Sequence, residues 1–143
     1  MQGLATMNEN EKLFDAISLG KIEVVKRLIS TTGFFTKHAP KAEVNAVGQG
    51  GSTPLHLACQ KNNKKMAKLL ISKGANVNAV DKSYGDTPLL CVSRKFDKGI
   101  AKLLITKGAN VNAENNEGNT PLHGACQKNE KNLVELLISR GAN

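Results

Sequence analysis

Two histidines and two cysteines recur at matching positions and are the side chains best suited to chemistry. His56 and Cys59 lie in PLHLAC, and His123 and Cys126 lie in PLHGAC. A histidine that acts as a general base needs a nucleophile or an acid beside it, and no such residue recurs with this pair. Cys59, Cys91 and Cys126 show no CxxC spacing, which argues against a zinc site and a disulfide framework. The sequence therefore predicts no catalytic residue, no metal and no cofactor.

A glycine-rich stretch, GQGGST at residues 48–53, raises the question of a phosphate-binding loop. It lacks the lysine and the spacing of that motif. Carboxylates do not recur as a pair with a poised base either. We therefore expect a protein that is not an enzyme and has no small-molecule substrate.

The recurring residues belong to a repeat of 33 or 34 residues. Thr-Pro-Leu triplets begin at Thr53, Thr87 and Thr120, and Gly-Ala-Asn triplets follow at Gly74, Gly108 and Gly141. Two markers that move together indicate a true repeat. A period of this size is typical of stacked units, each of which cannot bury its apolar face alone.

One unit can be interpreted residue by residue. Thr53 is suited to cap a helix with its hydroxyl, and Pro54 to occupy the first helical position, where no N–H is needed. A second helix is predicted over residues 64–72, and Gly74 is predicted to end it in a left-handed conformation. The inward stripe of this second helix has helical spacing: Met66, Leu69 and Leu70. Each unit is therefore predicted to contain a helix, a turn, a second helix and an extended loop with a glycine such as Gly85 near its tip.

The stretches TPLHLAC, TPLLCVS and TPLHGAC, each followed by LLIS or LLIT and then GAN, resemble the ankyrin repeat. The resemblance covers residues 44–143 as three repeats, and residues 11–30 are similar to a first repeat without TPLH. It implies an all-α ankyrin solenoid of about four repeats in one domain over residues 1–143. The expected boundaries are about 8–43 for repeat 1, with an inserted loop at 30–43, about 44–77 for repeat 2, about 78–111 for repeat 3 and about 112–143 for repeat 4. The resemblance also implies that His56 and His123 form hydrogen bonds within and between turns.

The resemblance implies a non-enzymatic module that binds another protein on its concave side. In that family the contacts come from the loop tips and from the ends of the first helices. The helix-end positions here are Gln60 and Lys61, Arg94 and Lys95, and Gln127 and Lys128. The tip positions are Ser83, Tyr84, Asp86, Asn116, Glu117 and Asn119, with Gln49, Gly50 and Ser52 in the preceding loop.

Charge and one aromatic residue support this hypothesis. The helix ends carry a repeated row of lysines along the expected groove floor, whereas the tips carry an expected acidic rim of Asp81, Asp86, Glu114 and Glu117. A groove of mixed charge suits a protein better than a phosphate backbone. Tyr84, the only tyrosine, is a candidate binding hot spot. The alternatives are that Tyr84 packs on a neighbouring loop and that the lysines are only a solvated surface.

Other functions remain open from sequence alone. The formal net charge of +8 suits an electrostatic binder of nucleic acid or of an acidic membrane surface, although few aromatics are present for stacking on single strands. A third hypothesis is an ankyrin targeting segment of a larger, catalytic protein. The sequence has no signal-peptide pattern and no apolar run long enough to span a membrane. We expect a soluble protein in the cytoplasm, or in a host cytoplasm if it is a delivered effector.

Three phenylalanines and the last repeat lead to further expectations. Phe34 and Phe35 are expected to pack the inserted loop onto repeat 1, and Phe96 to cover a loop of the adjoining repeat. His38 is expected to be solvated. The last repeat keeps apolar residues at interior positions: Leu133, Leu136 and Leu137. Because a solenoid needs polar end units, we expect either a fragment or an end-to-end contact with another molecule there.

Overall fold

The computed structural model describes residues 7–30, 42–95 and 97–143. Within these ranges the regular structure is entirely helical, which confirms the all-α expectation. The expectations for Phe34, Phe35, His38 and Phe96 fall outside the described residues. The helices are α1 (Glu9–Ser18), α2 (Ile22–Ile29), α3 (Pro54–Gln60), α4 (Lys64–Ser72), α5 (Pro88–Ser93), α6 (Lys98–Thr106), α7 (Pro121–Gln127) and α8 (Lys131–Ser139), with a short 3-10 turn, η1 (Gln49–Gly51).

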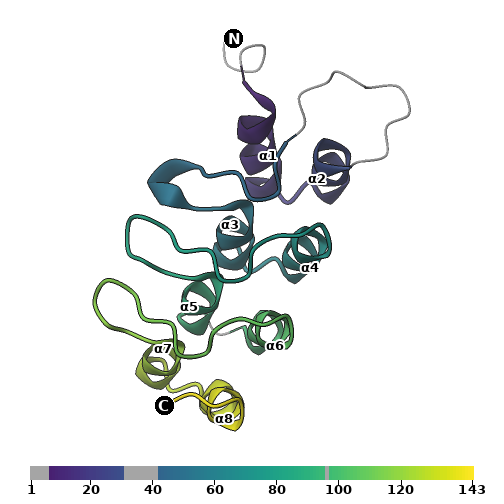
Figure 1. Cartoon of the computed structure of the whole chain (residues 1–143). Coiled ribbons are helices and arrows are strands. Elements are labelled where there is room, and N and C mark those ends of the chain that lie inside the picture. The colour runs from purple at the N-terminus through teal and green to yellow at the C-terminus, as the bar shows by residue number, and fades with distance from the viewer. Residues whose placement is uncertain (1–6, 31–41, 96) are drawn as a thin grey trace.

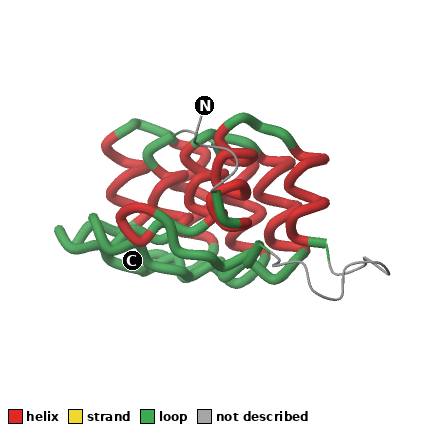
Figure 2. Tube along the Cα trace, turned by 90° about the horizontal axis from the view of Figure 1, so that it is seen from above, coloured by secondary structure: helices red, strands yellow, loops and turns green. Residues whose placement is uncertain are grey.

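The helices form pairs that stack in chain order into an elongated array (Figure 1). The first helices of the pairs, α1, α3, α5 and α7, contact one another in sequence and form one layer. The second helices, α2, α4, α6 and α8, form the other layer. The loops between pairs lie together at one end of the helices and project beyond them (Figure 2). In cross-section, the helices and the projecting loops form the two arms of an L (Figure 2). The surface between the first helices and the loops is called the inner angle below.

The predicted caps explain where the helices begin. Thr53 and Thr87 have extended backbone angles, and their hydroxyls accept the N–H of the third helical residue, His56 and Leu90. A proline follows each of them at the first helical position. The Asp97 side chain caps α6 in the same way. These caps satisfy N–H groups that have no partner inside the helix.

The core is a continuous aliphatic seam between the two helix layers. In α4 the predicted stripe is confirmed, because Met66 and Leu70 are fully buried and Leu69 is partly buried. Leu104 on α6 and Leu137 on α8 are also fully buried. Since successive pairs share this seam, each pair is stabilised by its neighbours.

A row of asparagines links the successive units at the base of the loops. The Asn78 side-chain amide donates to the carbonyl of Gly108 (3.0 Å), and its oxygen accepts the N–H of Asn110 (2.8 Å). Asn45 and Asn112 make the equivalent pairs of bonds, with Gly74 and Asn76 and with Gly141 and Asn143. The asparagine of the recurring Val-Asn-Ala sequence, which follows one helix pair, is thus bound to the residues that end the next pair, and this role was not predicted from the sequence.

Asn78→Ala is expected to lower the free energy of unfolding by about 1–2 kcal/mol, because two hydrogen bonds between repeats are lost at once. Urea denaturation followed by circular dichroism measures the change. Asn132, which is exposed on α8, supplies the control, and Asn132→Ala should change stability by less than about 0.5 kcal/mol. Equal stability of the two variants would show that the asparagine row does not stabilise the array.

Candidate partner-binding groove

The loop tips are held in fixed turns by side chains of their own loops. The Asp81 carboxylate accepts the N–H groups of Tyr84 (2.8 Å) and Gly85 (3.1 Å). In the next loop the Asn115 side chain accepts the N–H groups of Glu117 and Asn119, both at 3.0 Å. Asp and Asn favour turns because their side chains can bind nearby backbone donors in this way.

Successive tips are also joined to each other. The N–H groups of Lys82 and Ser83 donate to the carbonyl of Gly50, and the N–H of Asn116 donates to the carbonyl of Tyr84 at 2.9 Å. Gly85 allows this close approach. Its φ is +71°, and a Cβ there would lie 2.4 Å from the Asn116 side chain. The loop side of the inner angle is therefore a rigid row of loops joined by hydrogen bonds.

A buried polar network fixes the start of α5 to both neighbouring units. The Asp86 carboxylate accepts two bonds from the Arg94 guanidinium, at 2.9 and 3.1 Å, and one from the Asn115 amide at 3.0 Å. The Asp86 backbone carbonyl lies 2.9 Å from Nε2 of His56 in the preceding unit. Asp86 is only 3% exposed, so this network lies inside the array.

This burial corrects the expected acidic rim. Asp81 and Asp86 were expected among the exposed charges at the tips, but both are buried. Their carboxylates hold the loop backbone and Arg94, and Asp86 therefore does not offer its charge to a partner. Glu114 and Glu117 remain exposed near the tips.

The other predicted tip residues lie at the surface. Ser83, Asn116 and Glu117 are exposed, and Asn119 is half-buried. Tyr84 is 64% exposed, so its ring is not buried against the neighbouring loop. Its backbone, in contrast, is bound on both sides through Asp81 and Asn116.

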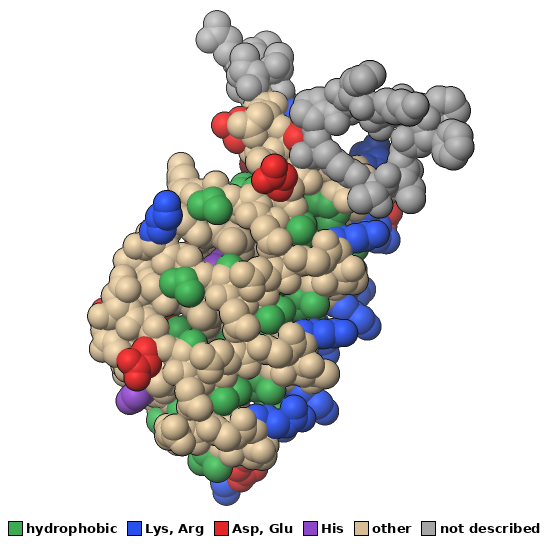
Figure 3. Space-filling model, in the orientation of Figure 1, with side chains coloured by type: hydrophobic (Ala, Val, Ile, Leu, Met, Phe, Trp, Pro, Cys, Tyr) green, Lys and Arg blue, Asp and Glu red, His purple; other side chains and the backbone are tan. Residues whose placement is uncertain are grey.

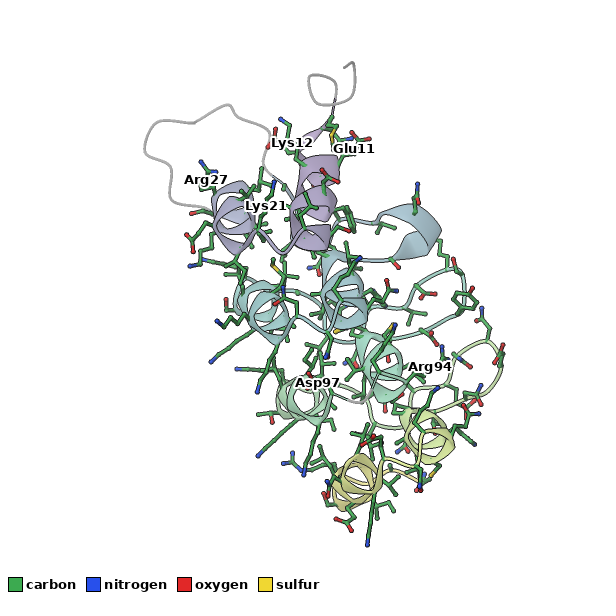
Figure 4. The ribbon with its side chains drawn as sticks, turned by 180° about the vertical axis from the view of Figure 1, so that it is seen from behind. Glu11, Lys12, Lys21, Arg27, Arg94 and Asp97 are labelled. Carbon is green, nitrogen blue, oxygen red and sulfur yellow. The ribbon has the colours of Figure 1, made fainter. Side chains whose placement is uncertain are left out.

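The predicted helix-end residues lie where the first helices end, on the side away from the loops. Lys61 and Lys128 are the C-cap residues of α3 and α7, and Lys95 follows the C-cap Arg94 of α5. All three lysines are exposed, as are Gln60 and Gln127. The lysine row therefore follows the far edge of the inner angle rather than its floor. The Arg94 side chain extends from the end of α5 toward the loop side of the array (Figure 4), where its guanidinium is bound to Asp86.

His56, Cys59 and Cys91 are buried inside the array, whereas His123 and Cys126 are exposed. Nδ1 of His56 accepts the N–H of Thr53 (3.1 Å), so Nε2 carries the proton that is donated to Asp86. Burial raises the pKa of the Cys91 thiol to about 12, with the Asp86 and Asp81 carboxylates adding to the shift. Burial also raises the pKa of Cys59. A thiol needs its thiolate form to act as a nucleophile, so neither cysteine is reactive at neutral pH.

Two further observations concern metals and membranes. In the part of the chain that the structure describes, no group of three or more His, Cys, Asp or Glu residues is placed to hold a metal ion. Among the same residues, no helix is long and apolar enough to cross a membrane.

Comparison with family models agrees with this architecture. A model of the ankyrin repeat matches residues 50–82, and a model of three ankyrin repeats matches residues 78–143. Together these matches cover more than half of the chain. The chain belongs to the ankyrin repeat family. Ankyrin repeats are in general protein–protein interaction modules, and their framework here is the stacked helix pairs with connected loops.

Individual ankyrin-containing relatives resemble only part of the chain. The Fowlpox virus protein FPV230, an ankyrin repeat protein by name, is 46% identical over 30% of this chain and 23% of its own length. Palmitoyltransferase akr1 of Schizosaccharomyces pombe is 40% identical over 48% of this chain and 9% of its own length. The ankyrin repeat and LEM domain-containing protein 1 homolog of Caenorhabditis elegans is 49% identical over 29% of this chain and 6% of its own length. The matched segments thus span less than a quarter of each of these three proteins.

A pocket at one end of the ankyrin array was not predicted from the sequence. A pocket of about 690 Å³ lies at the amino-terminal end of the inner angle, between α1, α3 and the loop that contains η1. Its lining includes Asp15 and Ser18 of α1 and Leu57 and Gln60 of α3. Site residues were predicted only in the repeats that carry a Thr-Pro-Leu triplet, and the first unit lacks this triplet. Asp15 and Ser18 occupy the same positions in the first unit as Leu57 and Gln60 in the second. This alignment was the sequence signal that could have indicated the pocket.

Proposed function

We propose that this chain is a non-enzymatic protein-binding module whose inner angle, formed by first helices and loop tips, receives a protein partner. The main support is Tyr84, a large aromatic residue that is 64% exposed on a backbone held by neighbouring groups. Aromatic residues of this kind dominate the binding energy of many interfaces. The partner and its pathway are not specified by this chemistry.

Rigidity is the physical reason why such a surface binds well. The Asp81 turn, the bond from Asn116 to Tyr84 and the Asp86 network order the loops during folding. A partner therefore does not have to provide the free energy of ordering them. The tips and far edge then supply specificity through exposed polar and charged groups: Ser83, Asn116, Glu117, Asn119, Lys61, Lys95 and Lys128.

The proposal is tested by identifying a partner and measuring its affinity for groove variants. Affinity purification and mass spectrometry give the candidate, and calorimetric titration gives the dissociation constant. Tyr84→Ala is expected to weaken binding about 30-fold, as for a hot spot worth roughly 2 kcal/mol. The triple variant Lys61→Glu, Lys95→Glu, Lys128→Glu is expected to weaken it through the reversed edge charge.

A matched control uses a similar lysine on the opposite layer. Lys102 is exposed on α6, and Lys102→Glu is expected to leave affinity within about two-fold, as for a peripheral charge. If Tyr84→Ala and the lysine triple both bind the partner as tightly as the unmodified chain, the inner angle is not the binding surface.

A second candidate function is electrostatic binding of nucleic acid or of an acidic membrane. Lys and Arg side chains form a row along the edge made by α4, α6 and α8 (Figure 3). The C-cap residues of these three helices are basic and exposed: Lys73, Lys107 and Arg140. A salt titration with duplex DNA or phosphatidylserine vesicles distinguishes the two functions, since phosphate binding weakens steeply as salt rises. The protein partner contacts proposed above depend on Tyr84 at any salt concentration.

A third candidate is that the array is the targeting segment of a larger protein with catalytic activity elsewhere. The partial likeness to a yeast palmitoyltransferase favours this possibility without assigning that activity to these residues. In either case we propose a cytoplasmic location, which fluorescence microscopy of the tagged chain in its source cell would check.

A further inference from the structure

We propose that the pocket between α1, α3 and the η1 loop is the part of the groove that binds a basic, apolar segment of the partner. The expected occupant is an extended peptide stretch in which Lys or Arg alternates with an aliphatic residue. This inference rests on the proposed protein-binding function and adds to it where the partner's charge must lie.

Three apolar side chains line the pocket together with polar residues. Phe14 of α1, Leu57 of α3 and Val47 of the loop all line it. Val47 is 64% exposed and is one of several large apolar side chains at the surface of the described residues. The loop is pressed onto the aromatic ring, because a Cβ at Gly48 would lie 2.9 Å from Phe14. The pocket thus has a firm apolar base that can receive aliphatic side chains or the methylene stem of a lysine.

Two carboxylates lie at the same pocket, on the amino-terminal helix. Glu11 and Asp15 line it, one helical turn apart on α1. The Asp15 carboxylate forms no ion pair or hydrogen bond with any described residue, whereas its backbone carbonyl accepts the N–H of Leu19. Glu11 uses one carboxylate oxygen, Oε2, to accept the N–H of Asn8 (2.9 Å), and its other oxygen remains available. In Figure 4, Glu11 lies on the side of α1 nearer the η1 loop, whereas Lys12 lies on the side toward α2. Lys12 is bound there to Glu9 (2.7 Å).

This negative charge stands out in a chain whose formal net charge is +8. Among the described residues that line the pocket, none is a lysine or an arginine. In the later units the position of Asp15 is taken by Leu57, Cys91 and Gly124, so the carboxylate is confined to the first unit. The row of exposed lysines at the ends of the first helices begins at Lys61, next to the pocket residue Gln60. The pocket lining is therefore negative at the α1 end, and complementary charge places the partner's basic residues there.

The pocket has the volume of a binding site. Its volume of about 690 Å³ falls within the usual range for ligand sites, about 300–1,000 Å³, where a few polar groups orient a mainly apolar ligand. A Lys or Arg head at Asp15 and Glu11, with an aliphatic neighbour against Phe14 and Leu57, would satisfy both halves of this lining. An acidic segment would meet repulsion from the same two carboxylates.

Fluorescence anisotropy with two labelled peptides tests this proposal. One peptide of about ten residues alternates Arg and Lys with Leu, and the other has Glu in place of each basic residue. We expect the intact chain to bind the basic peptide and not the acidic one. The double variant Glu11→Gln, Asp15→Asn is expected to bind the basic peptide about five-fold more weakly, as for two partly exposed ion pairs. Asp15→Lys should weaken it further.

The matched control removes the same charge elsewhere. Glu114 and Glu135 are exposed and do not line the pocket, so Glu114→Gln, Glu135→Gln should keep the affinity of the intact chain. Amide NMR shifts on addition of the basic peptide are expected at Phe14, Val47 and Leu57. Equal weakening in both double variants, or shifts confined to other units, would overturn the assignment.

Failure of this inference can be told apart from failure of the proposed function. A protein partner that depends on Tyr84 but is unaffected by Glu11→Gln, Asp15→Asn would refute the acidic pocket and leave the binding module intact. Binding of the basic peptide at the pocket, with no protein partner sensitive to Tyr84→Ala or the lysine triple, would refute the wider groove instead.

Discussion

Leu104→Ala is expected to lower the free energy of unfolding by about 2–5 kcal/mol, the range for truncating a fully buried leucine. Leu104 is 0% exposed and belongs to the aliphatic seam that α6 shares with its neighbours. Against a total stability of about 5–15 kcal/mol, this loss is large enough to unfold one unit. The cavity cannot collapse easily, because helices on both sides are held by their own pairs.

Urea denaturation and hydrogen exchange together measure the effect. In a repeat array, units can unfold separately, so protection should fall most in α5 and α6 and least in α1. Leu19, which is 61% exposed, provides the control, and Leu19→Ala should change stability by less than about 0.5 kcal/mol. A loss below about 1 kcal/mol for Leu104→Ala would mean that the seam is more adaptable than the packed structure indicates.

Asp86→Ala is expected to have the second large effect, a loss of about 2–3 kcal/mol. The change removes both bonds to the Arg94 guanidinium and the bond to Asn115. Removing one partner of a buried ion pair costs about 3–5 kcal/mol, but the Arg94 side chain is 37% exposed and can turn to water. The expected loss is therefore below that range.

The Asp86 prediction also links stability to the binding surface. Without the carboxylate, Asn115 loses a contact that joins the two loops, and the Tyr84 amide should exchange faster with solvent. Asp15→Ala is the control, since Asp15 is exposed. A double-mutant cycle with Arg94→Ala measures the coupling between the two side chains. Additive effects of the two changes would show that the ion pair contributes nothing.

The fold could be predicted because the residues that specify its helices act locally and recur in each repeat. Thr53 and Pro54 specify a helix start, Gly74 a helix end with a φ of +95°, and Met66 and Leu70 an inward stripe. Each of these depends on a residue's own backbone preferences or on neighbours one turn away. Repetition at 33 or 34 residues then requires stacking, because a single pair of short helices cannot bury its apolar face. The repeat boundaries themselves stay an expectation.

The candidate site was predictable only in part. The repeated pattern predicted that Tyr84 lies at a loop tip, and its side chain is 64% exposed there. The role of Asn78 in joining successive helix pairs could not be predicted, because an Asn in a loop can bind many nearby backbone groups. Its partners, Gly108 and Asn110, lie about 30 residues away and are supplied by the next unit.

The sequence alone determined the element types, the order of stacking and the absence of any recurring catalytic pattern, because those depend on periodicity and side-chain chemistry. Only the tertiary structure decided which charges are exposed. Asp86 was expected to be an exposed tip charge, yet Arg94 and Asn115 enclose it, whereas Asp15 had no predicted role and lies at a pocket. Burial depends on what the neighbouring units bring within a few ångströms, and that proximity is created by packing rather than by spacing along the chain.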